Sequence, residues 1–346
     1  MWPDFCSLVE PEGKMAAKKR ILSGNRPTGR LHWGNYFGAL KNWVGLQDEY
    51  DCYYFVADWH ALTTGYEHTE GICESVKEVL KDWLAAGLDP KKSTIFIQSW
   101  VPEHAELHLL LSMMTPLGWL ERVPSFKDMQ TQLSDRDLNM YGFLGYPLLQ
   151  AADILIYKAD FVPVGEDQLA HLEFARELVR RFAFITKHDV FSEPKPMLTE
   201  APRIPGIDGR KMSKSFGNAI YMADSDEEIR KKMMAAITDP ARKRRQDPGD
   251  PDVCNIFAYH KLYTDRAKVA EIASQCRSAG IGCVDCKKLC IQNAIEFWTP
   301  IRARRERWEG KDDELLAMAR AGSERAREVA RLVMEKVRKV MGVVYG

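Results

Sequence analysis

The sequence predicts an α/β protein, built as a doubly wound parallel sheet and followed by an all-helical region. Short apolar runs alternate with segments of helical periodicity through residues 18–222, which indicates strands joined by crossover helices. The runs are continuously apolar, as is typical of parallel strands buried on both faces. Strand patterns stop after residue 222, so we expect a first domain at 18–222, a helical domain at 223–346 and an extension at 1–17.

Each element is assigned from its own pattern. Apolar runs predict strands at residues 20–23, 53–57, 94–97 and 161–164. Apolar residues at helical spacing predict helices at residues 36–46, 76–88, 169–182, 226–237, 269–276 and 286–297. A stripe of small and apolar side chains from Ala326 to Met341 predicts a last helix. Segment 203–218, rich in Gly, Pro and Lys, is expected to be a loop.

Charge and hydropathy limit the classes of protein. The 346-residue chain carries 49 Lys and Arg against 49 Asp and Glu, so any RNA contact must use local basic patches rather than a global field. No apolar stretch approaches the roughly 20 residues that span a bilayer, and residues 1–17 lack the apolar run of a secretory signal. We therefore expect a cytoplasmic protein without membrane contact, whose eight cysteines do not form disulfides.

The segment from Ser23 to Asn35 follows the first strand and opens the first helix. Ligands of open parallel sheets bind at the carboxyl ends of the strands, and a helix N-terminus favours negative charge. His32 and Asn35 lie three residues apart, so both side chains can point at one phosphate. The alternative is a glycine-containing turn in which the histidine only caps the helix.

The segment from Gly209 to Asn218 is a second candidate for phosphate binding. Lys211 and Lys214 lie three residues apart among small hydroxyl residues, and they would neutralise the charge that develops as pyrophosphate departs. Taken alone, a basic loop is more often solvated surface. Its occurrence downstream of the Ser23–Asn35 segment is what makes phosphate binding the better interpretation.

Together the two segments resemble the class I aminoacyl-tRNA synthetases, whose motifs are a HIGH-type turn and a KMSKS loop. Residues 32–35 match the first motif with two departures, Trp33 and Asn35, and residues 211–215 match the second letter for letter. The resemblance implies a Rossmann-like catalytic domain that uses ATP and Mg²⁺ to activate an amino acid for transfer to tRNA. It implies catalytic roles for His32, Asn35, Lys127, Lys211 and Lys214. The remaining ATP-binding residues that it implies are Arg26, Thr28, Gly34, Gly165, Asp167, Met212, Ser213 and Ser215.

Residues 146–153 and 162–168 resemble segments that the tryptophan and tyrosine members share. Tyrosine enzymes are expected to carry a Tyr where this chain has Leu22 and an Asp where it has Arg26. Leu22 would leave a phenol unpaired, whereas an indole needs one acceptor among apolar walls. The resemblance therefore points to tryptophan and to tRNA(Trp), with the tyrosine enzyme as the alternative. It implies a tryptophan site made of Asp153 as indole acceptor, the walls Leu22, Val162 and Val164, and the amino-group partners Tyr146, Gln150 and Gln168.

Cys254, Cys276, Cys283 and Cys286 form the pattern C-x21-C-x6-C-x2-C, which predicts a metal site. The pattern resembles a bacterial subset of the tryptophan enzymes that carries a 4Fe–4S cluster. Zinc and free thiols remain alternatives, and Cys290 is either a bystander or a substitute ligand. Two basic groups, residues 242–245 and 302–307, flank the cysteines and are a candidate tRNA surface.

Two further expectations concern the protein as a whole. The family resemblance, and no feature of the sequence itself, implies a homodimer. A non-catalytic regulatory protein that uses the cysteine cluster as a sensor is the competing function. The intact lysine loop and Asp153 argue against it, because such a protein needs neither.

Overall fold

The structure, a computed structural model, describes residues 18–123, 140–198 and 204–344. The predicted extension 1–17, with Cys6, and the predicted phosphate contact Lys127 lie outside the described residues. Within them, five parallel strands form one sheet in the order β3-β2-β1-β4-β5. The strands are β1 (Arg20–Asn25), β2 (Asp51–Val56), β3 (Ser93–Ile97), β4 (Phe161–Val164) and β5 (Lys195–Leu198).

Alternate residues of strands β1 to β4 enter two different hydrophobic clusters. Tyr54 and Val56 of β2 pack in one cluster, while Tyr53 and Phe55 pack in the other. The sheet is therefore covered on both faces, which confirms the doubly wound α/β prediction. The fifth strand, β5, has no counterpart among the predicted strands, because its four residues include Lys195 and Pro196 and are mostly exposed.

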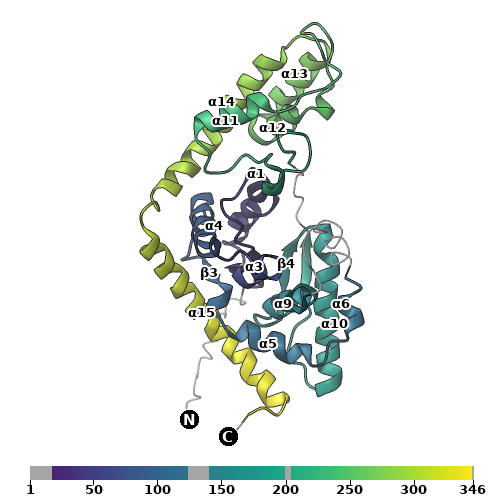
Figure 1. Cartoon of the computed structure of the whole chain (residues 1–346), viewed down its shortest axis with the longest axis vertical. Coiled ribbons are helices and arrows are strands. Elements are labelled where there is room, and N and C mark those ends of the chain that lie inside the picture. Colours follow the sequence, from purple (N-terminus) through teal and green to yellow (C-terminus); the bar gives the residue numbers. More distant parts are fainter. Residues whose placement is uncertain (1–17, 124–139, 199–203, 345–346) are drawn as a thin grey trace, which may run out of the picture.

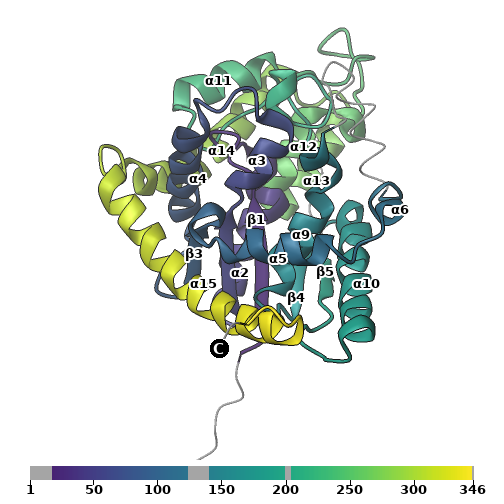
Figure 2. The ribbon, with the colours of Figure 1, turned by 60° about the horizontal axis from the view of Figure 1, so that its bottom comes forward.

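Helices connect these strands and cover the sheet (Figures 1 and 2). They are α1 (Trp33–Asn35), the π-helical turn η1 (Tyr36–Leu40), α2 (Lys41–Leu46), α3 (Asp58–Gly65), α4 (Ile72–Ala86), η2 (Gln98–Trp100), α5 (Glu103–Ser112), α6 (Leu117–Leu120), α8 (Tyr141–Leu144), α9 (Tyr146–Leu155), η3 (Glu166–Gln168) and α10 (Leu169–Thr186). Among the described residues, no helix has both the length and the apolar character that crossing a bilayer requires.

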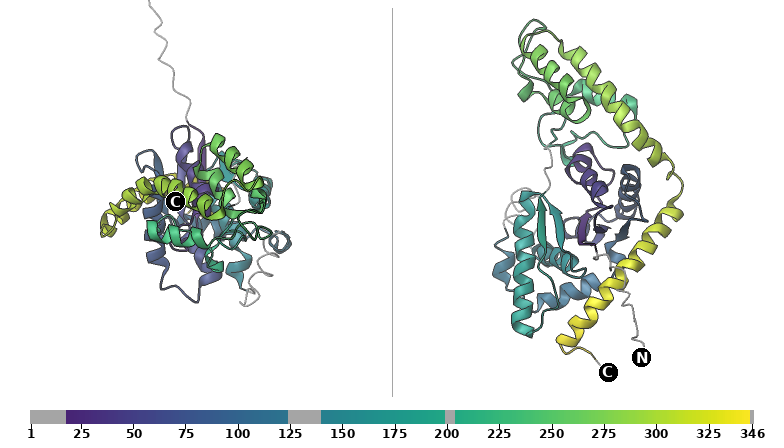
Figure 3. Two further views of the ribbon diagram at one scale, coloured as in Figure 1. Left: turned by 90° about the horizontal axis from the view of Figure 1, so that it is seen from above. Right: turned by 180° about the vertical axis from the view of Figure 1, so that it is seen from behind.

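Beyond β5 the regular elements of the described chain are helices, and the helical region after residue 222 was predicted. Its helices are η4 (Lys214–Phe216), α11 (Asp226–Ala235), η5 (Pro251–Val253), α12 (Asn255–Tyr263), α13 (Arg266–Arg277), α14 (Cys283–Glu306) and α15 (Asp312–Val340). The predicted helix at 286–297 is thus only the middle of α14. Helices α11 to α14 gather at one end of the molecule, and α15 runs back along the α/β part (Figures 1 and 3).

Helix α15 lies directly on strand β3, so the last helix packs with the sheet rather than with the other C-terminal helices. A Cβ atom at Gly322 would lie 1.8 Å from the carbonyl oxygen of Ile95, so only glycine allows this approach. Ser323 Oγ accepts a 3.3 Å hydrogen bond from the Ile97 amide. Ala326, Ala330 and Val337, from the predicted stripe, complete the cluster beneath the sheet.

Candidate active site

A cavity of about 510 Å³ opens where the strand order reverses, between the carboxyl ends of β1 and β4. This is the position at which open α/β sheets bind ligands. All the residues predicted to bind the amino acid line it, namely Leu22, Tyr146, Gln150, Asp153, Val162, Val164 and Gln168. The structure therefore brings together in one cavity residues that lie up to 146 positions apart in the sequence, since Leu22 and Gln168 both line it.

Asp153 is the buried acid of this cavity, with 1% of its surface exposed. Its carboxylate oxygens lie 2.9 Å from His60 Nε2 and 2.5 Å from His104 Nδ1, and Gln98 Nε2 donates to both at 2.8 and 2.9 Å. Burial acts to raise the pKa of Asp153, but the two histidines lower it to about 2. The cavity therefore contains a carboxylate that is ionised at neutral pH.

Three of the Asp153 partners were not predicted from the sequence. His60 and Gln98 lie just beyond the ends of β2 and β3, and polar residues after neighbouring strand ends were the signal that could have identified them. His104 lies in α5 and gave no such signal. Its Nε2 atom is 2.7 Å from the Tyr157 hydroxyl, so both ring nitrogens of His104 have a hydrogen-bond partner.

The predicted amino-group partners line the cavity and differ in burial. Tyr146 is buried and its hydroxyl is 3.5 Å from His171 Nε2, while Gln150 and Gln168 are partly exposed. Gln168 Nε2 donates a 2.8 Å hydrogen bond to Asp167. Asp167, the predicted ribose contact, is exposed and lies outside the cavity lining.

The turn from Arg26 to Asn35 connects β1 to α1 and borders the cavity. His32 Nδ1 accepts a 3.2 Å hydrogen bond from the Asn35 amide, and the Asn35 side chain accepts one of 3.0 Å from the His32 amide. Both side chains therefore cap α1, and the alternative of a capping histidine describes this contact correctly. Because Nδ1 accepts, the ring proton is on Nε2, which leaves His32 a donor suited to a phosphate oxygen.

The loop that carries the second motif lies against this turn. Lys214 Nζ donates to the Thr28 carbonyl at 2.9 Å, the Thr28 hydroxyl at 3.0 Å and the Gly29 carbonyl at 3.0 Å. Gly29 has a φ angle of +88°, which favours glycine and presents its carbonyl at this turn. Burial lowers the pKa of Lys214 to about 8, although the Asp82 carboxylate opposes the shift.

The other loop residues divide into anchors and exposed groups. Met212 is buried, and the Ser213 amide donates a 2.8 Å hydrogen bond to the Asn218 side chain. Lys211 and Ser215 are exposed. Of the other predicted ATP contacts, Arg26, Thr28 and Gly165 line the cavity, whereas His32, Gly34 and Asn35 lie beside it on the turn.

The four cysteines of the predicted metal site come from three segments, the N-cap of α12, the end of α13 and the first turn of α14. They lie within electrostatic range of one another, since burial and then Cys254, Cys276 and Cys283 raise the pKa of Cys286 to about 12. Across the described ranges, no group of three or more His, Cys, Asp or Glu side chains is arranged to hold a metal ion. The metal site remains a prediction.

Most arginines of the second predicted basic group, residues 302–307, have partners within the chain. Arg302 pairs with Asp226, Arg304 donates a 2.6 Å hydrogen bond to the Ala85 carbonyl, and Arg305 is 6% exposed. Arg307 is exposed. The expectation that this whole group faces tRNA is wrong, because three of its guanidinium groups have partners within the chain.

The fold, the cavity and the two motifs define a class I aminoacyl-tRNA synthetase. Residues 14–299 match the family described as tRNA synthetases class I (W and Y), that is, for tryptophan and tyrosine. The chain belongs to this family.

Individual relatives indicate which branch of the family this chain resembles. The tryptophan–tRNA ligase of Thermotoga maritima is 48% identical over 332 residues, covering 94% of this chain and 100% of that protein. The tryptophan–tRNA ligase of Aquifex aeolicus is 44% identical over 394 residues, with the same shares covered. The crystal structure of tryptophanyl-tRNA synthetase from Campylobacter jejuni complexed with ADP and tryptophan superposes with a TM-score of 0.84 at 32% identity. That match covers 93% of this chain and 99% of the other.

Proposed function

We propose that this chain activates L-tryptophan with ATP and transfers it to tRNA(Trp) in the cytoplasm. The observation that carries the proposal is the ionised Asp153 carboxylate in a cavity whose walls include Leu22 and Val162. An indole presents one N–H donor on an apolar ring, and this cavity offers one anionic acceptor among apolar walls. Residues 18–222 are the proposed catalytic domain and 223–346 the proposed tRNA-side helical domain.

The first step joins the tryptophan carboxylate to the α-phosphorus of ATP and releases pyrophosphate. The chain needs no covalent nucleophile, because positioning and charge stabilisation supply the rate in phosphoryl and nucleotidyl transfer. The protonated Nε2 of His32 would donate to a phosphate oxygen, and Lys214 would follow the departing pyrophosphate. ATP brings ligand oxygens for Mg²⁺ in its own phosphates. A hydroxyl of the terminal tRNA ribose then attacks the carbonyl carbon of the adenylate, which forms the tryptophanyl ester and releases AMP.

Tyrosine is the competing substrate, and Leu22 argues against it. Leu22 is 1% exposed and lines the cavity, so a phenol directed at it would bury an unpaired hydroxyl. Such a group costs about 1–3 kcal/mol. The test is exchange of labelled pyrophosphate into ATP with each amino acid in turn. Exchange that depends on tryptophan and not on tyrosine supports the proposal, and the reverse preference would overturn it.

We also propose that Cys254, Cys276, Cys283 and Cys286 hold a 4Fe–4S cluster, with zinc as the alternative. Iron–sulfur clusters are held by four thiolates, and a cluster of four irons spaces them more widely than one ion does. The support is the sequence pattern together with the mutual electrostatic influence of these thiols. Cys290 is buried in the hydrophobic core with Sγ 3.8 Å from the Ile256 carbonyl, which favours a packing role for it.

The tRNA surface is proposed to lie beside these cysteines. Lys243, Arg244 and Arg245 are exposed, and basic side chains of this kind contact phosphates. Arg242 of the same run is turned inward, where it donates to the carbonyls of Arg245 and Ile281. We therefore assign tRNA contact to the last three residues of the run and a structural role to Arg242.

A homodimer is the last part of the proposal. Large apolar side chains are exposed on α5, α6, α8 and the segments beside them, namely Leu109, Met113, Leu117, Met140 and Tyr141. The Tyr141 hydroxyl lies 3.3 Å from His108 Nε2, so α8 meets α5 next to these side chains. Exposed apolar patches mark interaction surfaces, and the proposed occupant is a second copy. Light scattering of Met113→Glu should show monomer where the wild type is a dimer.

A further inference from the structure

Arg305, near the end of α14, forms ion pairs with two carboxylates of helix α4. Its Nε atom lies 2.8 Å from Asp82 Oδ1, and an Nη atom lies 2.6 Å from Glu78 Oε2. Asp82 is fully buried and Arg305 is 6% exposed. Water therefore screens these contacts weakly, and each charge depends on the other for compensation.

The same two carboxylates hold the backbone and a side chain of the ATP-binding turn. Asp82 Oδ2 accepts a 2.6 Å hydrogen bond from the amide of Leu31, the residue before His32. Glu78 Oε2 accepts a 2.8 Å hydrogen bond from Arg30 Nε. Arg305 therefore fixes, through α4, two consecutive residues of the turn whose next residue is the phosphate-binding histidine.

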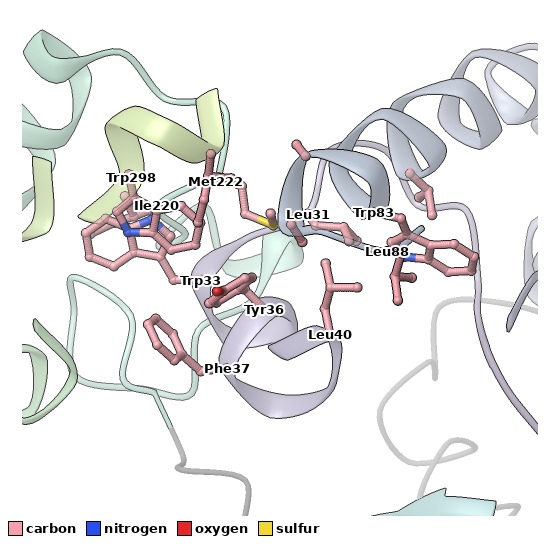
Figure 4. Packing of buried hydrophobic residues seen from close by; sticks show 14 of the residues in the cluster. Leu31, Trp33, Tyr36, Phe37, Leu40, Trp83, Leu88, Ile220, Met222 and Trp298 are labelled. Carbon is pink, nitrogen blue, oxygen red and sulfur yellow. The ribbon is translucent and has the colours of Figure 1, made fainter. Parts of the chain in front are cut away.

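Helix α14 also contacts this turn directly. Trp298 stacks on Trp33 with ring centroids 5.6 Å apart and planes 8° from parallel (Figure 4). Both indoles are fully buried. This contact accounts for the bulky Trp33 in the HIGH-type motif. Helix α14 therefore acts on the residue after His32 directly and on the two residues before it through α4.

We propose that Arg305 and Asp82 are positioning residues of the nucleotide site. They do not reach the cavity themselves. They set the position of the Leu31 amide, and hence of His32 at the N-terminus of α1, before ATP binds. The geometry predicts that their loss weakens ATP binding while leaving the tryptophan pocket intact. This inference rests on the proposed function, because it assigns ATP to the turn.

The competing explanation is that the pair only stabilises the packing of α14 on α4. A second ion pair between a C-terminal helix and the α/β part serves as the control that distinguishes the two explanations. Arg327 of α15 contacts the Glu103 carboxylate of α5 at 2.8 and 3.1 Å, and Glu103 is 5% exposed. That pair also joins a C-terminal helix to the α/β part, and neither residue belongs to the turn or lines the cavity.

The test compares ATP and tryptophan binding by calorimetry in full-length protein. The variant Asp82→Asn with Arg305→Met removes both charges at nearly constant volume, so no unpaired charge is left buried. We expect its Kd for ATP to rise about tenfold, the lower end of what loss of an orienting partner costs at other sites. Its Kd for tryptophan should change less than about twofold, and Arg305→Lys, which keeps a cation for Asp82, should restore most of the ATP affinity.

Three outcomes would overturn the inference. They are wild-type ATP affinity in the double variant, equal loss of ATP and tryptophan affinity, or the same ATP loss in the control Glu103→Gln with Arg327→Met. If the double variant does not fold, Arg305→Lys and Arg305→Gln provide the same comparison. Wild-type protein that binds ATP but shows no tryptophan-dependent pyrophosphate exchange would instead defeat the proposed function and leave this binding test valid.

Discussion

His104 lies behind Asp153, a residue that lines the cavity, with a 2.5 Å contact between His104 Nδ1 and Asp153 Oδ1. The other ring nitrogen of His104 faces the Tyr157 hydroxyl at 2.7 Å, so the ring is held at both ends. Tyr157 and His104 are fully buried, and the chain of contacts fixes the direction of the carboxylate. Asp153 therefore presents an oriented charge that requires no rearrangement when a ligand with one N–H group enters.

The first prediction concerns this carboxylate. Asp153→Asn keeps the size of the side chain but replaces an anionic acceptor by a neutral amide. We expect kcat/KM for tryptophan in pyrophosphate exchange to fall by the equivalent of about 1–3 kcal/mol. The KM for ATP should be nearly unchanged, because the ATP-binding turn does not contact Asp153. Wild-type kinetics with tryptophan would show that Asp153 is not the indole acceptor.

The residues proposed to bind tryptophan were predicted from the family resemblance, and the parallel sheet explains why they meet in one cavity. Leu22 and Val162 occupy neighbouring strands, and their convergence follows from the parallel sheet that the apolar runs predict. His104 was not predictable, because it lies within a helix that mixes apolar and polar residues, and nothing in that pattern distinguishes it from a surface histidine. Arg305 was assigned to the surface because the sequence shows a basic run and does not show that Asp82, 223 positions earlier, accepts it.

The second prediction concerns Lys214 and alkaline pH. Its pKa of about 8 means that the free enzyme loses this positive charge as the pH rises through 8. Since kcat/KM reports the free enzyme, kcat/KM for ATP should fall above that pH, by about tenfold per unit if the charge is required. Lys214→Arg keeps its charge at every accessible pH, so its profile should stay level between pH 8 and 9.5. Parallel profiles for the two proteins would exclude Lys214 as the titrating group.

The third prediction concerns His32 and acid pH. Burial first, and then the charges of Lys214 and Lys211, lower the pKa of His32 from 6.5 to about 4. Below pH 6.5 the unfolded chain binds a proton that the folded chain does not, so stability falls as the pH drops from 6.5 to 4. The glutamine side chain of His32→Gln cannot bind this proton. The free energy of unfolding of the wild type relative to the variant should therefore fall by about 2 kcal/mol between pH 7.5 and 5.

Urea titrations at the two pH values provide the measurement for His32. His171→Gln is the matched control, because burial also lowers the pKa of His171 to about 4 and yet His171 lies in the amino-acid cavity. Without ligand, the difference in unfolding free energy between wild type and variant should change with pH by the same amount for both variants. Saturating ATP should alter this pH dependence for His32→Gln alone, since a bound phosphate favours the protonated ring of His32. A pH-independent difference for His32→Gln would contradict the buried neutral histidine.

The last prediction concerns the cysteines. Protein purified without oxygen should be brown, absorb broadly near about 400 nm and contain about four iron atoms per chain. Cys283 begins α14, whereas Trp298, which contacts Trp33, and Arg305, which contacts Asp82 of α4, lie roughly four and six turns further along the helix. Cys283→Ser should therefore lose the colour and weaken tRNA charging, while tryptophan-dependent pyrophosphate exchange largely survives.

Cys290→Ser is the control for that experiment, because Cys290 packs in the hydrophobic core and follows Cys286 by one helical turn. It should keep both the colour and the charging activity. Stoichiometric zinc in colourless anaerobic protein would exclude the iron–sulfur cluster. Parallel loss of exchange and charging in Cys283→Ser would show that the cysteine end of α14 supports the ATP-binding turn as well as the tRNA surface. Since Trp298 and Arg305 lie on the same helix, the ratio of the two losses measures how far the effect of the cysteine site extends along α14.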